Sequence, residues 1–289
     1  MLVHINDIVS KAYRDGYAIG AFNTSNLEIS LGIIQAAVAL HSPVIVQVSE
    51  TSIKYAGIKP ITHIVQTIAK NEAVNVPVAL HLDHGKSFRS VAECIHAGFS
   101  SIMIDQSDLP FDENVALTRQ AVDYAHKRGV WAQGELGQLK GKEDFVDVVD
   151  DQALMTDPGD AKNFVMQTKV DSLAIAIGNI HGIIKMRQKI KPKLDIDRLK
   201  AISDLVKIPL VLHGASGLDQ NQIQQAVQNG IAIINIDTEI RLAFTETLRD
   251  ILERDQKLYD PREVLGPSIK AVQALVEKKI KMFGSANRA

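Results

Sequence analysis

The sequence contains a single cysteine, Cys94, so the chain cannot form an intrachain disulfide. Cys94 lies in the helical pattern of residues 91–95, where we expect a buried, inert thiol rather than a nucleophile. The first seven residues, Met-Leu-Val-His-Ile-Asn-Asp, lack the charged and then apolar pattern of a secretory signal peptide. Together these absences predict a reducing compartment, and we expect the protein in the cytoplasm.

Long hydrophobic runs and an excess of positive charge are also missing. No apolar stretch reaches the roughly 20 residues that a membrane-spanning helix needs. The chain has 32 Lys and Arg against 34 Asp and Glu, a formal net charge of -2, so there is no basic excess to attract a nucleic acid or an anionic membrane. We therefore expect neither of these among the partners.

No stretch rich in Gly, Pro or Ser and no low-complexity tract divides the chain of 289 residues. Hydrophobic residues make up 46% of the sequence, which is ample for a large core. An α/β barrel of about 250 residues folds as one domain. We therefore predict a single domain over residues 1–289.

What the chain does contain is a regular alternation of short apolar runs with longer segments of helical period. The runs are rich in Val and Ile, as parallel strands buried on both faces should be. There are eight, at residues 17–22, 44–48, 78–82, 101–104, 130–134, 172–177, 210–212 and 231–236. This alternation is typical of βα units, and eight strands favour a (β/α)8 TIM barrel over an open doubly wound sheet.

Helical patterns at the two ends of the chain fall outside the alternation. Residues 5–14 predict an extra N-terminal helix, and residues 240–253 and 267–283 predict a C-terminal helical extension. A third exception is the acidic stretch 137–160, which has no firm period. A loop of that length inside a compact domain is usually functional or disordered.

Polar side chains follow nearly every predicted strand. In order they are Asn23, Ser49, Glu50, Asp83, His84, Asp105, Glu135, His181, His213, Asn235 and Asp237. In a barrel these strand ends converge on one mouth, where active sites are built. The three histidines among them each precede a glycine, and three imidazoles with an open fourth position are a catalytic zinc arrangement.

Two of these residues have a plain alternative explanation. Asp83 lies beside a candidate zinc ligand and could act as an acid or base. Alternatively, His84 could be a hydrogen-bonded core histidine and Asp83 the cap of a helix that begins near Ser87. His81, two residues before Asp83 on the same face of the strand, could support the site through a hydrogen bond or only pack.

The segments after the last two strands, residues 213–217 and 235–238, are rich in small and hydroxyl residues. Such segments leave backbone N–H groups available to an anion, and barrels frequently bind phosphate at these two loops. They could also be ordinary turns, with Thr238 as a helix N-cap. Beside three histidines, the phosphate interpretation suggests a metal enzyme that acts on a phosphorylated small molecule.

These motifs together resemble the class II, metal-dependent ketose-bisphosphate aldolases, the family of fructose-1,6-bisphosphate and tagatose-1,6-bisphosphate aldolases. The resemblance runs nearly end to end, through residues 21–23, 81–85, 104–105, 110–111, 134–137, 176–178, 181–182, 212–217, 235–238 and 284–287. It implies reversible cleavage of a ketose 1,6-bisphosphate into dihydroxyacetone phosphate and glyceraldehyde 3-phosphate. A Schiff-base aldolase would instead need a lysine at the mouth, and none of the polar residues at the strand ends is one.

The resemblance also implies roles for individual residues. His84, His181 and His213 would hold a catalytic zinc ion, and Asp105 and Glu135 a second divalent ion. Asp83 would exchange a proton with the aldehyde-derived oxygen, and Glu143, in a loop hinged at glycines, would remove the C3 proton. Substrate, with a monovalent Na+ or K+ nearby, would be bound by Asn23, Ser49, Gly182, Gly214, Ala215, Ser216, Asn235, Ile236, Asp237 and Thr238.

Four residues depart from the family pattern. Histidine is common where Asp108 stands, glutamate at Gln133, a small threonine- or serine-like residue at Asn179, and alanine or asparagine at Asp237. The extra charge of Asp237 would weaken phosphate binding unless that carboxylate is paired or turned away. The choice between fructose and tagatose substrates therefore stays open.

Two other functions also remain open. The first is the same reaction on another phosphorylated ketose, such as a deoxy-keto-gluconate phosphate. The second is a barrel that keeps the metal and phosphate ligands but serves as a binding or regulatory protein without catalysis. Whichever of these functions the protein has, we expect a homo-oligomer, a dimer or a tetramer.

Overall fold

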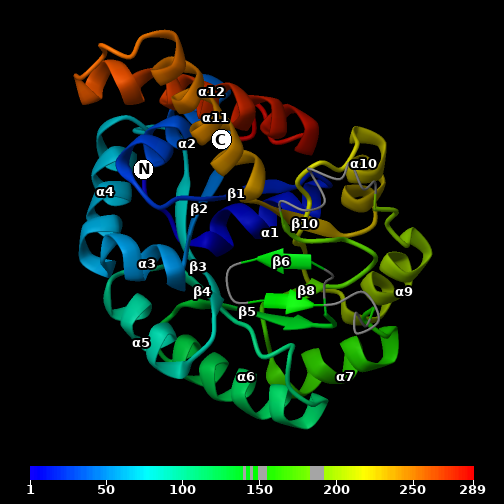
Figure 1. Ribbon diagram of the computed structural model, residues 1–289. Coiled ribbons are helices and arrows are strands. Elements are labelled where there is room, and N and C mark those ends of the chain that lie inside the picture. The colour runs from blue at the N-terminus through cyan, green and yellow to red at the C-terminus, as the bar shows by residue number, and fades with distance from the viewer. Residues whose placement is uncertain (139–140, 144–145, 149–154, 183–191) are drawn as a thin grey trace.

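Eight parallel strands close into a barrel, with neighbours in the order β1-β10-β9-β8-β5-β4-β3-β2 (Figure 1). The computed structural model describes residues 1–138, 141–143, 146–148, 155–182 and 192–289. Each predicted strand is present, and the bounds are β1 (Ile19–Asn23), β2 (Val44–Ser49), β3 (Val78–Gly85), β4 (Ser101–Ile104), β5 (Trp131–Leu136), β8 (Ser172–Ile175), β9 (Leu210–Leu212) and β10 (Ile231–Ile236). The closed order confirms the TIM barrel and excludes the open sheet.

Helices surround the barrel and cover the outer face of its strands (Figure 1). Those that connect successive strands are α2 (Leu27–Ala39), α3 (Glu50–Ala56), α4 (Ile58–Asn71), α5 (Phe88–His96), α6 (Phe111–His126), α7 (Pro158–Thr168), α9 (Ile196–Val206) and α10 (Gln220–Gln228). The short helix α3 was not predicted. It begins at a side-chain cap, in which Ser49 accepts a hydrogen bond from the Ser52 N–H, and it ends at Gly57.

The predicted N-terminal helix, α1 (Ile5–Asp15), closes the amino end of the barrel. Its buried face contributes Ile5, Ile8, Val9 and Ala12 to a cluster with inward-facing strand residues such as Ile45 and Trp131. The helix ends where Gly16 adopts a left-handed conformation with φ 71°. One end of the barrel interior is therefore an apolar core.

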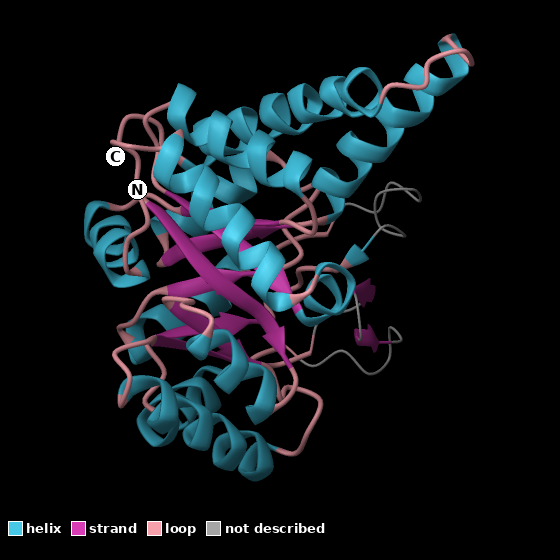
Figure 2. Cartoon of the chain, turned by 90° about the vertical axis from the view of Figure 1, so that its left-hand side faces the viewer, coloured by secondary structure: helices cyan, strands magenta, loops and turns pink. Residues whose placement is uncertain are grey.

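The predicted C-terminal extension consists of α11 (Thr238–Arg254) and α12 (Pro261–Phe283). The two helices lie side by side and reach beyond the carboxyl ends of the barrel strands (Figure 2). A buried ion pair joins them, with Lys279 Nζ 2.5 Å from a Glu239 carboxylate oxygen. Helix α12 also packs along α2, which fixes the extension against the barrel wall.

The stretch 137–160 contains regular structure that its sequence did not indicate. Strands β6 (Gly141–Glu143) and β7 (Val146–Val148) form an antiparallel pair, and α7 begins at Pro158. The pair lies beyond the carboxyl ends of the barrel strands, on the side to which the C-terminal helices project (Figure 2). The expectation of a long loop without regular elements was therefore wrong over these residues.

The structure also bears on two absences in the sequence. Cys94 is 1% exposed and free of a disulfide partner. Burial, followed by the nearby carboxylates of Glu50 and Glu93, raises the pKa of its thiol to about 12, so the thiol stays protonated and inert, as expected. Among the described residues, no helix combines the length and apolar character needed to cross a membrane.

Candidate active site

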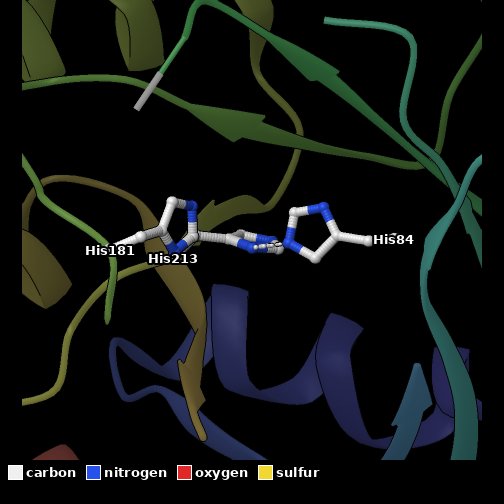
Figure 3. Close-up of side chains that lie close together, drawn as sticks. All are labelled: His84, His181 and His213. Carbon is white, nitrogen blue, oxygen red and sulfur yellow. Dashed lines mark hydrogen bonds between the residues drawn. The ribbon is translucent and has the colours of Figure 1, made fainter. Parts of the chain in front are cut away.

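Three histidine rings converge at the carboxyl end of the barrel (Figure 3). His84 belongs to the end of β3, while His181 and His213 follow β8 and β9. One ring nitrogen from each lies within 4.8 Å of the other two, and the Nδ1 of His213 is 3.0 Å from the Nε2 of His84. All three are buried, so their nitrogens face one another in a site that is shielded from bulk water.

An irregularity in β3 brings two neighbouring residues into this site. Successive side chains of a regular strand point to opposite faces, so Asp83 and His84 should diverge. The pairing of β3 with β4 shifts between Leu82 and Gly85, and His84 has a left-handed backbone with φ 46°. This conformation is unfavourable for a residue with a side chain. Its result is that an Asp83 oxygen lies 4.0 Å from His84 Nε2.

A carboxylate holds the far side of the His84 ring. His84 Nδ1 is 2.8 Å from Asp105 Oδ2 and 3.7 Å from Glu135 Oε2. Burial alone would lower the pKa of His84, but the neighbouring Asp83, Asp105 and Glu135 raise it well above its ordinary value. A proton on Nδ1 donated to Asp105 leaves Nε2 directed at the other two histidines, which is the arrangement of a metal-binding imidazole.

A second candidate metal cluster consists of His84, Asp105 and Glu135, whose ligand atoms also lie within 4.8 Å of one another. Burial raises the pKa of Glu135 to about 8, and the charge of Asp105 adds to that effect. Burial would likewise raise the pKa of Asp105, but His84 and Lys86 outweigh it and hold that pKa well below its usual range. The cluster therefore has one firmly ionised carboxylate and one that readily takes a proton.

Lys86 is a residue of the site that the sequence analysis missed. Its Nζ lies 2.9 Å from Asp105 Oδ2 and 3.6 Å from Asp108 Oδ1. Desolvation would lower the pKa of Lys86, but the carboxylates around it raise the pKa instead, so it carries a positive charge. It lies one position beyond the end of β3, outside the set of strand-end residues that the sequence drew attention to.

Amide side chains fix the orientation of Asp83. Asn23 Nδ2 donates to Asp83 Oδ2 at 2.7 Å, and Asn235 Nδ2 donates to Asp83 Oδ1 at 3.3 Å. Gln47 in turn donates to Asn23 Oδ1 at 2.6 Å. Helix α5 is capped by Ser87, which accepts from the Ser90 N–H, so Asp83 is not the cap that the plain alternative required.

A small cavity beside these residues contains most of the candidate substrate-binding residues. Its walls include Asn23, Asp83, His181, Gly182, His213, Gly214, Ser216, Asn235, Asp237 and Thr238. Ala215 and Ile236 are fully buried and do not line it. Ser49 does not line it either, among the described residues, since its hydroxyl contacts Thr51 at 2.9 Å and caps α3.

Two glycines, Gly182 and Gly214, line the side of the cavity where we expect phosphate to bind. Gly182 and Gly214 have φ values of 87° and 61°, a left-handed backbone that glycine adopts without strain. A Cβ at Gly214 would lie 2.7 Å from the Ile180 carbonyl oxygen, which is too close for any side chain. The loop after β9 therefore depends on glycine for its course past the three clustered histidines.

The carboxylate of Asp237 forms an ion pair with Arg241. It accepts from Arg241 through Nε at 2.7 Å and lies 2.7 Å from the Nη2 of the same guanidinium. Asp237, not Thr238, is the N-cap residue of α11, and its side chain makes no capping hydrogen bond. A groove that adjoins the cavity shares Asn23 and Asp237 with it and is further lined by Thr24, Ser25, Ile29, Thr51, Ser52, Tyr55 and Arg241.

Comparison with known proteins agrees with this geometry. The family model described as "Fructose-bisphosphate aldolase class-II" matches residues 3–288. The chain belongs to the class II fructose-bisphosphate aldolase family. A fructose-bisphosphate aldolase of Geobacillus stearothermophilus is 43% identical over 289 residues, which cover 100% of this chain and 99% of that protein.

Two solved structures from the same comparisons share the fold. The YdjI aldolase of Escherichia coli K12 is 34% identical, with a TM-score of 0.86 and 100% of both chains covered. Fructose-bisphosphate aldolase of Campylobacter jejuni is 25% identical, with a TM-score of 0.82, and the match covers 100% of this chain and 97% of that one. The resemblance that the motifs indicated is thus confirmed.

The departures from the aldolase family pattern have identifiable surroundings. Asp108 is the second partner of Lys86, and Asp237 is the partner of Arg241. Asn179 donates to the His213 carbonyl oxygen at 2.9 Å and accepts from the Ile177 N–H at 2.8 Å, so it fixes the backbone of a candidate zinc ligand.

Two further candidates from the sequence, His81 and Glu143, are not among the described residues that line the cavity. His81 Nδ1 pairs with Ser101 Oγ at 2.7 Å, and burial together with the charge of His84 lowers its pKa to about 3, so it is neutral and supports the interior without touching the histidine cluster. Glu143 ends β6, and its side chain falls outside the described part of the structure. Its role as a base stays a prediction.

Proposed function

We propose that the protein is a zinc-dependent aldolase that reversibly cleaves a ketose 1,6-bisphosphate, of fructose or tagatose, into dihydroxyacetone phosphate and glyceraldehyde 3-phosphate. The observation that supports this most is the cluster of three buried histidines beside a carboxylate that two amides hold in place. Neutral ring nitrogens from three histidines are the donor set of a catalytic zinc site with one open position. The fructose-bisphosphate aldolase names of the relatives support the same reaction class.

His84, His181 and His213 would hold the zinc ion. Bound there, zinc would supply Lewis acid chemistry and stabilise the negative charge that develops on the ketose oxygens. The donors around it fit such an ion, because His84 Nδ1 is already taken by Asp105 and the opposite nitrogen points inward. We further propose a weaker second divalent position at His84, Asp105 and Glu135, and a monovalent Na+ or K+ beside the substrate phosphate.

Asp83 would donate and accept the proton at the oxygen of the aldehyde half. The amides of Asn23 and Asn235 support this role because each donates to one carboxylate oxygen of Asp83, which orients the carboxylate at the wall of the cavity. The backbone around Gly182 and Gly214 would bind the phosphate of dihydroxyacetone phosphate. Glu143 would remove the C3 proton when the segment that carries β6 approaches the substrate.

The adjoining groove would accept the aldehyde half and its phosphate. It is lined by hydroxyls and by Arg241, whose side chain is 50% exposed although it also pairs with Asp237. A guanidinium suits a phosphate because its donors match two oxygens at once. Ser49 would act indirectly, since it caps the helix that carries Thr51 and Ser52 into the groove.

Metal removal tests the proposal directly. We expect dialysis against a strong chelator to abolish cleavage of fructose 1,6-bisphosphate or tagatose 1,6-bisphosphate, and added zinc to restore it. Borohydride in the presence of substrate should leave no covalent adduct, since no Schiff base forms. Full activity after verified metal removal would contradict the proposal, and rates for the two bisphosphates in one coupled assay would identify the preferred C4 stereocentre.

Another phosphorylated keto-sugar, such as a deoxy-keto-gluconate phosphate, is a second candidate substrate. The ion pair of Asp237 and Arg241 supports keeping it, because it places a carboxylate at the junction of cavity and groove where the family commonly has a neutral residue. Cleavage of that substrate in preference to both bisphosphates would favour this alternative. Zinc and phosphate binding without turnover of any of the three would favour a binding protein without catalysis.

Proton removal can be followed apart from cleavage, which tests Glu143 by itself. In heavy water without aldehyde, the C3 hydrogen of dihydroxyacetone phosphate should exchange. If Glu143 is the base, Glu143→Ala should suppress this exchange about as strongly as cleavage, with little change in ligand affinity. Asp83→Ala should leave exchange largely intact. Exchange at the wild-type rate in Glu143→Ala would place the base elsewhere.

The remaining expectations concern the whole molecule. We infer that residues 1–289 act as one domain, because α12 at the end of the chain packs on α2 near its start. A cytoplasmic location accords with the free, buried Cys94. A dimer or tetramer is supported by the projecting α11 and α12, near whose junction Tyr259 is 92% exposed. Sedimentation of the purified chain would test the oligomeric state.

A further inference from the structure

The ammonium group of Lys86 lies at the edge of the second candidate metal cluster, in contact with Asp105. Its Nζ is 2.9 Å from Asp105 Oδ2, the same oxygen that His84 Nδ1 contacts at 2.8 Å. The other oxygen, Asp105 Oδ1, already accepts two hydrogen bonds, from the N–H of Ser107 at 3.1 Å and from its hydroxyl at 2.7 Å. A divalent ion that uses Asp105 must therefore compete with Lys86 for Oδ2.

The backbone of Lys86 is held from both sides, which sets the direction of its side chain. The N–H donates to Glu50 Oε1 at 2.7 Å, and the carbonyl oxygen accepts from Gln106 Nε2 at 3.1 Å. The side chain is 22% exposed, and it reaches from this fixed backbone to a carboxylate that is 1% exposed. Lys86 is thus anchored at the edge of the cluster and does not lie on a free surface.

The rest of the cluster has the features of a cation site. Glu135 is 4% exposed, and its Oε2 has no hydrogen-bond partner among the described residues. A buried carboxylate oxygen without a donor is costly unless a cation or a proton satisfies it. Asp105 and Glu135 are thus two buried acids whose nearby positive groups are the His84 ring, 3.7 Å from Glu135 Oε2, and the Lys86 ammonium on Asp105.

We propose that Lys86 is a built-in counter-cation for the cluster of His84, Asp105 and Glu135, and that it determines whether this cluster binds a second divalent ion. This inference rests on the proposed function at one point, because His84 belongs both to the proposed zinc site and to the second cluster. A divalent ion and an ammonium on the same carboxylate oxygen repel each other strongly in a buried site. The second ion therefore binds weakly while Lys86 occupies its position.

Asp108 gives this arrangement a second position for the ammonium. Its Oδ1 is 3.6 Å from Lys86 Nζ, and its side chain is 70% exposed, in contrast to that of Asp105. When the concentration of divalent ions is high, the lysine can turn outward to Asp108 without losing a carboxylate partner. Because Asp108 offers a second carboxylate, the Lys86 ammonium can leave Asp105 and a metal ion can take its place there.

Counting metal ions tests the proposal without reference to catalysis. The metal-depleted full-length protein would be dialysed to equilibrium against buffered free Zn2+, and bound zinc per chain measured by elemental analysis. We expect the wild type to bind one ion tightly and a second only at much higher free zinc. Lys86→Met and Lys86→Gln should bind the second ion roughly tenfold or more tightly than the wild type, because the competing charge is gone.

Two control variants make the comparison specific. Lys86→Arg keeps the positive charge and should bind the second ion as weakly as the wild type. Lys207→Met makes the same change at an exposed lysine, 3.4 Å from Asp204 on the surface, and should leave both zinc affinities unchanged. Circular dichroism of each variant would confirm that the fold is retained. If Lys86→Met or Lys86→Gln fails to fold, the other variant still tests the proposal.

The outcomes separate this inference from the proposed function. A wild-type chain that binds no zinc tightly would overturn the proposed metal enzyme. A wild-type chain that binds one ion tightly, with second-ion affinity unchanged in Lys86→Met and Lys86→Gln, would overturn the role of Lys86 and leave the zinc site standing. Equal affinity for two ions in the wild type would also overturn it.

Discussion

The two ends of the barrel interior are built from the same eight strands, yet they differ completely in chemistry. At the amino end, inward-facing residues such as Ile45, Ala79 and Trp131 pack against the apolar face of α1. At the carboxyl end, the next inward-facing residues along most of these strands are polar, and β3 passes from Ala79 through His81 to Asp83. On β3, the apolar core at Ala79 and the polar site at Asp83 are thus only four positions apart.

The comparison teaches how a buried polar site is tolerated. Apolar residues at the amino end need only fill space, and their burial stabilises the fold. Polar residues at the carboxyl end lose their contacts with water and must be paired to offset that loss. The chain of contacts from Gln47 through Asn23 to Asp83 does this, and Lys86 does it for Asp105. The amino end should therefore control stability, and the carboxyl end activity.

The largest expected effect comes from breaking the carboxyl end at Asp83. Asp83→Ala should lower turnover by about 10²- to 10⁴-fold, since that is what a general acid and base typically contributes. Zinc content should stay at the wild-type level, because Asp83 is not one of the three histidines proposed to hold the ion. Turnover and metal content would be measured on the same preparation. Asp204→Ala, an exposed aspartate, is the control, and near-normal turnover in Asp83→Ala would assign Asp83 a structural role.

A substitution in the apolar core at the amino end should have the opposite effect, a loss of stability without a loss of turnover. Ile5 of α1 is 1% exposed, and Ile5→Ala should lower the free energy of unfolding by about 2–5 kcal/mol, the usual cost of truncating a buried isoleucine. Turnover per folded molecule should not change. Urea unfolding would give the stability, with Leu205→Ala as the control at a side chain that is 43% exposed. A large loss of turnover in folded Ile5→Ala would show that the two ends are coupled.

The sequence predicted the strands and the convergence of their polar ends because both follow from local patterns. Apolar runs locate the strands, and in a closed parallel barrel every strand end meets at one mouth. His84, His181 and His213 could therefore be placed together from sequence positions alone. The same reasoning explains why Asn235 was found, as a polar residue near the end of β10.

What the sequence did not predict depends on tertiary contacts. Lys86 lies one residue beyond β3, and only the folded chain brings its ammonium group to Asp105. The left-handed backbone of His84 was not predicted either, because only a few per cent of non-glycine residues adopt that conformation, even though histidine is enriched among them. Asp237 raised the question of an unpaired charge, and the answer was Arg241, one helical turn further along α11. The i,i+4 spacing of Asp237 and Arg241 is visible in the sequence and could have predicted this ion pair.

The smallest expected effect lies at the boundary between the two ends, where Gln133 stands. Its Nε2 is 3.3 Å from Met103 Sδ on the apolar side and 3.3 Å from His213 Nε2 on the polar side. The Nδ1 of His213 faces His84. If zinc binds that nitrogen, the proton of the ring must sit on Nε2 and needs an acceptor. The amide of Gln133 can turn its oxygen toward the ring and supply one.

Replacing Gln133 therefore tests how far the polar end extends into the barrel. Gln133→Leu removes the acceptor and should weaken zinc binding by about 10- to 100-fold, the usual range for a residue that supports a metal ligand. Gln133→Glu keeps an acceptor and should bind zinc at least as tightly as the wild type. Both affinities would be measured by competition with a chelator, alongside the urea stability of the metal-free variants. If Gln133→Leu lost stability but kept its zinc affinity, Gln133 would belong to the packed core, and Asn235 would be left as the partner of the His213 ring.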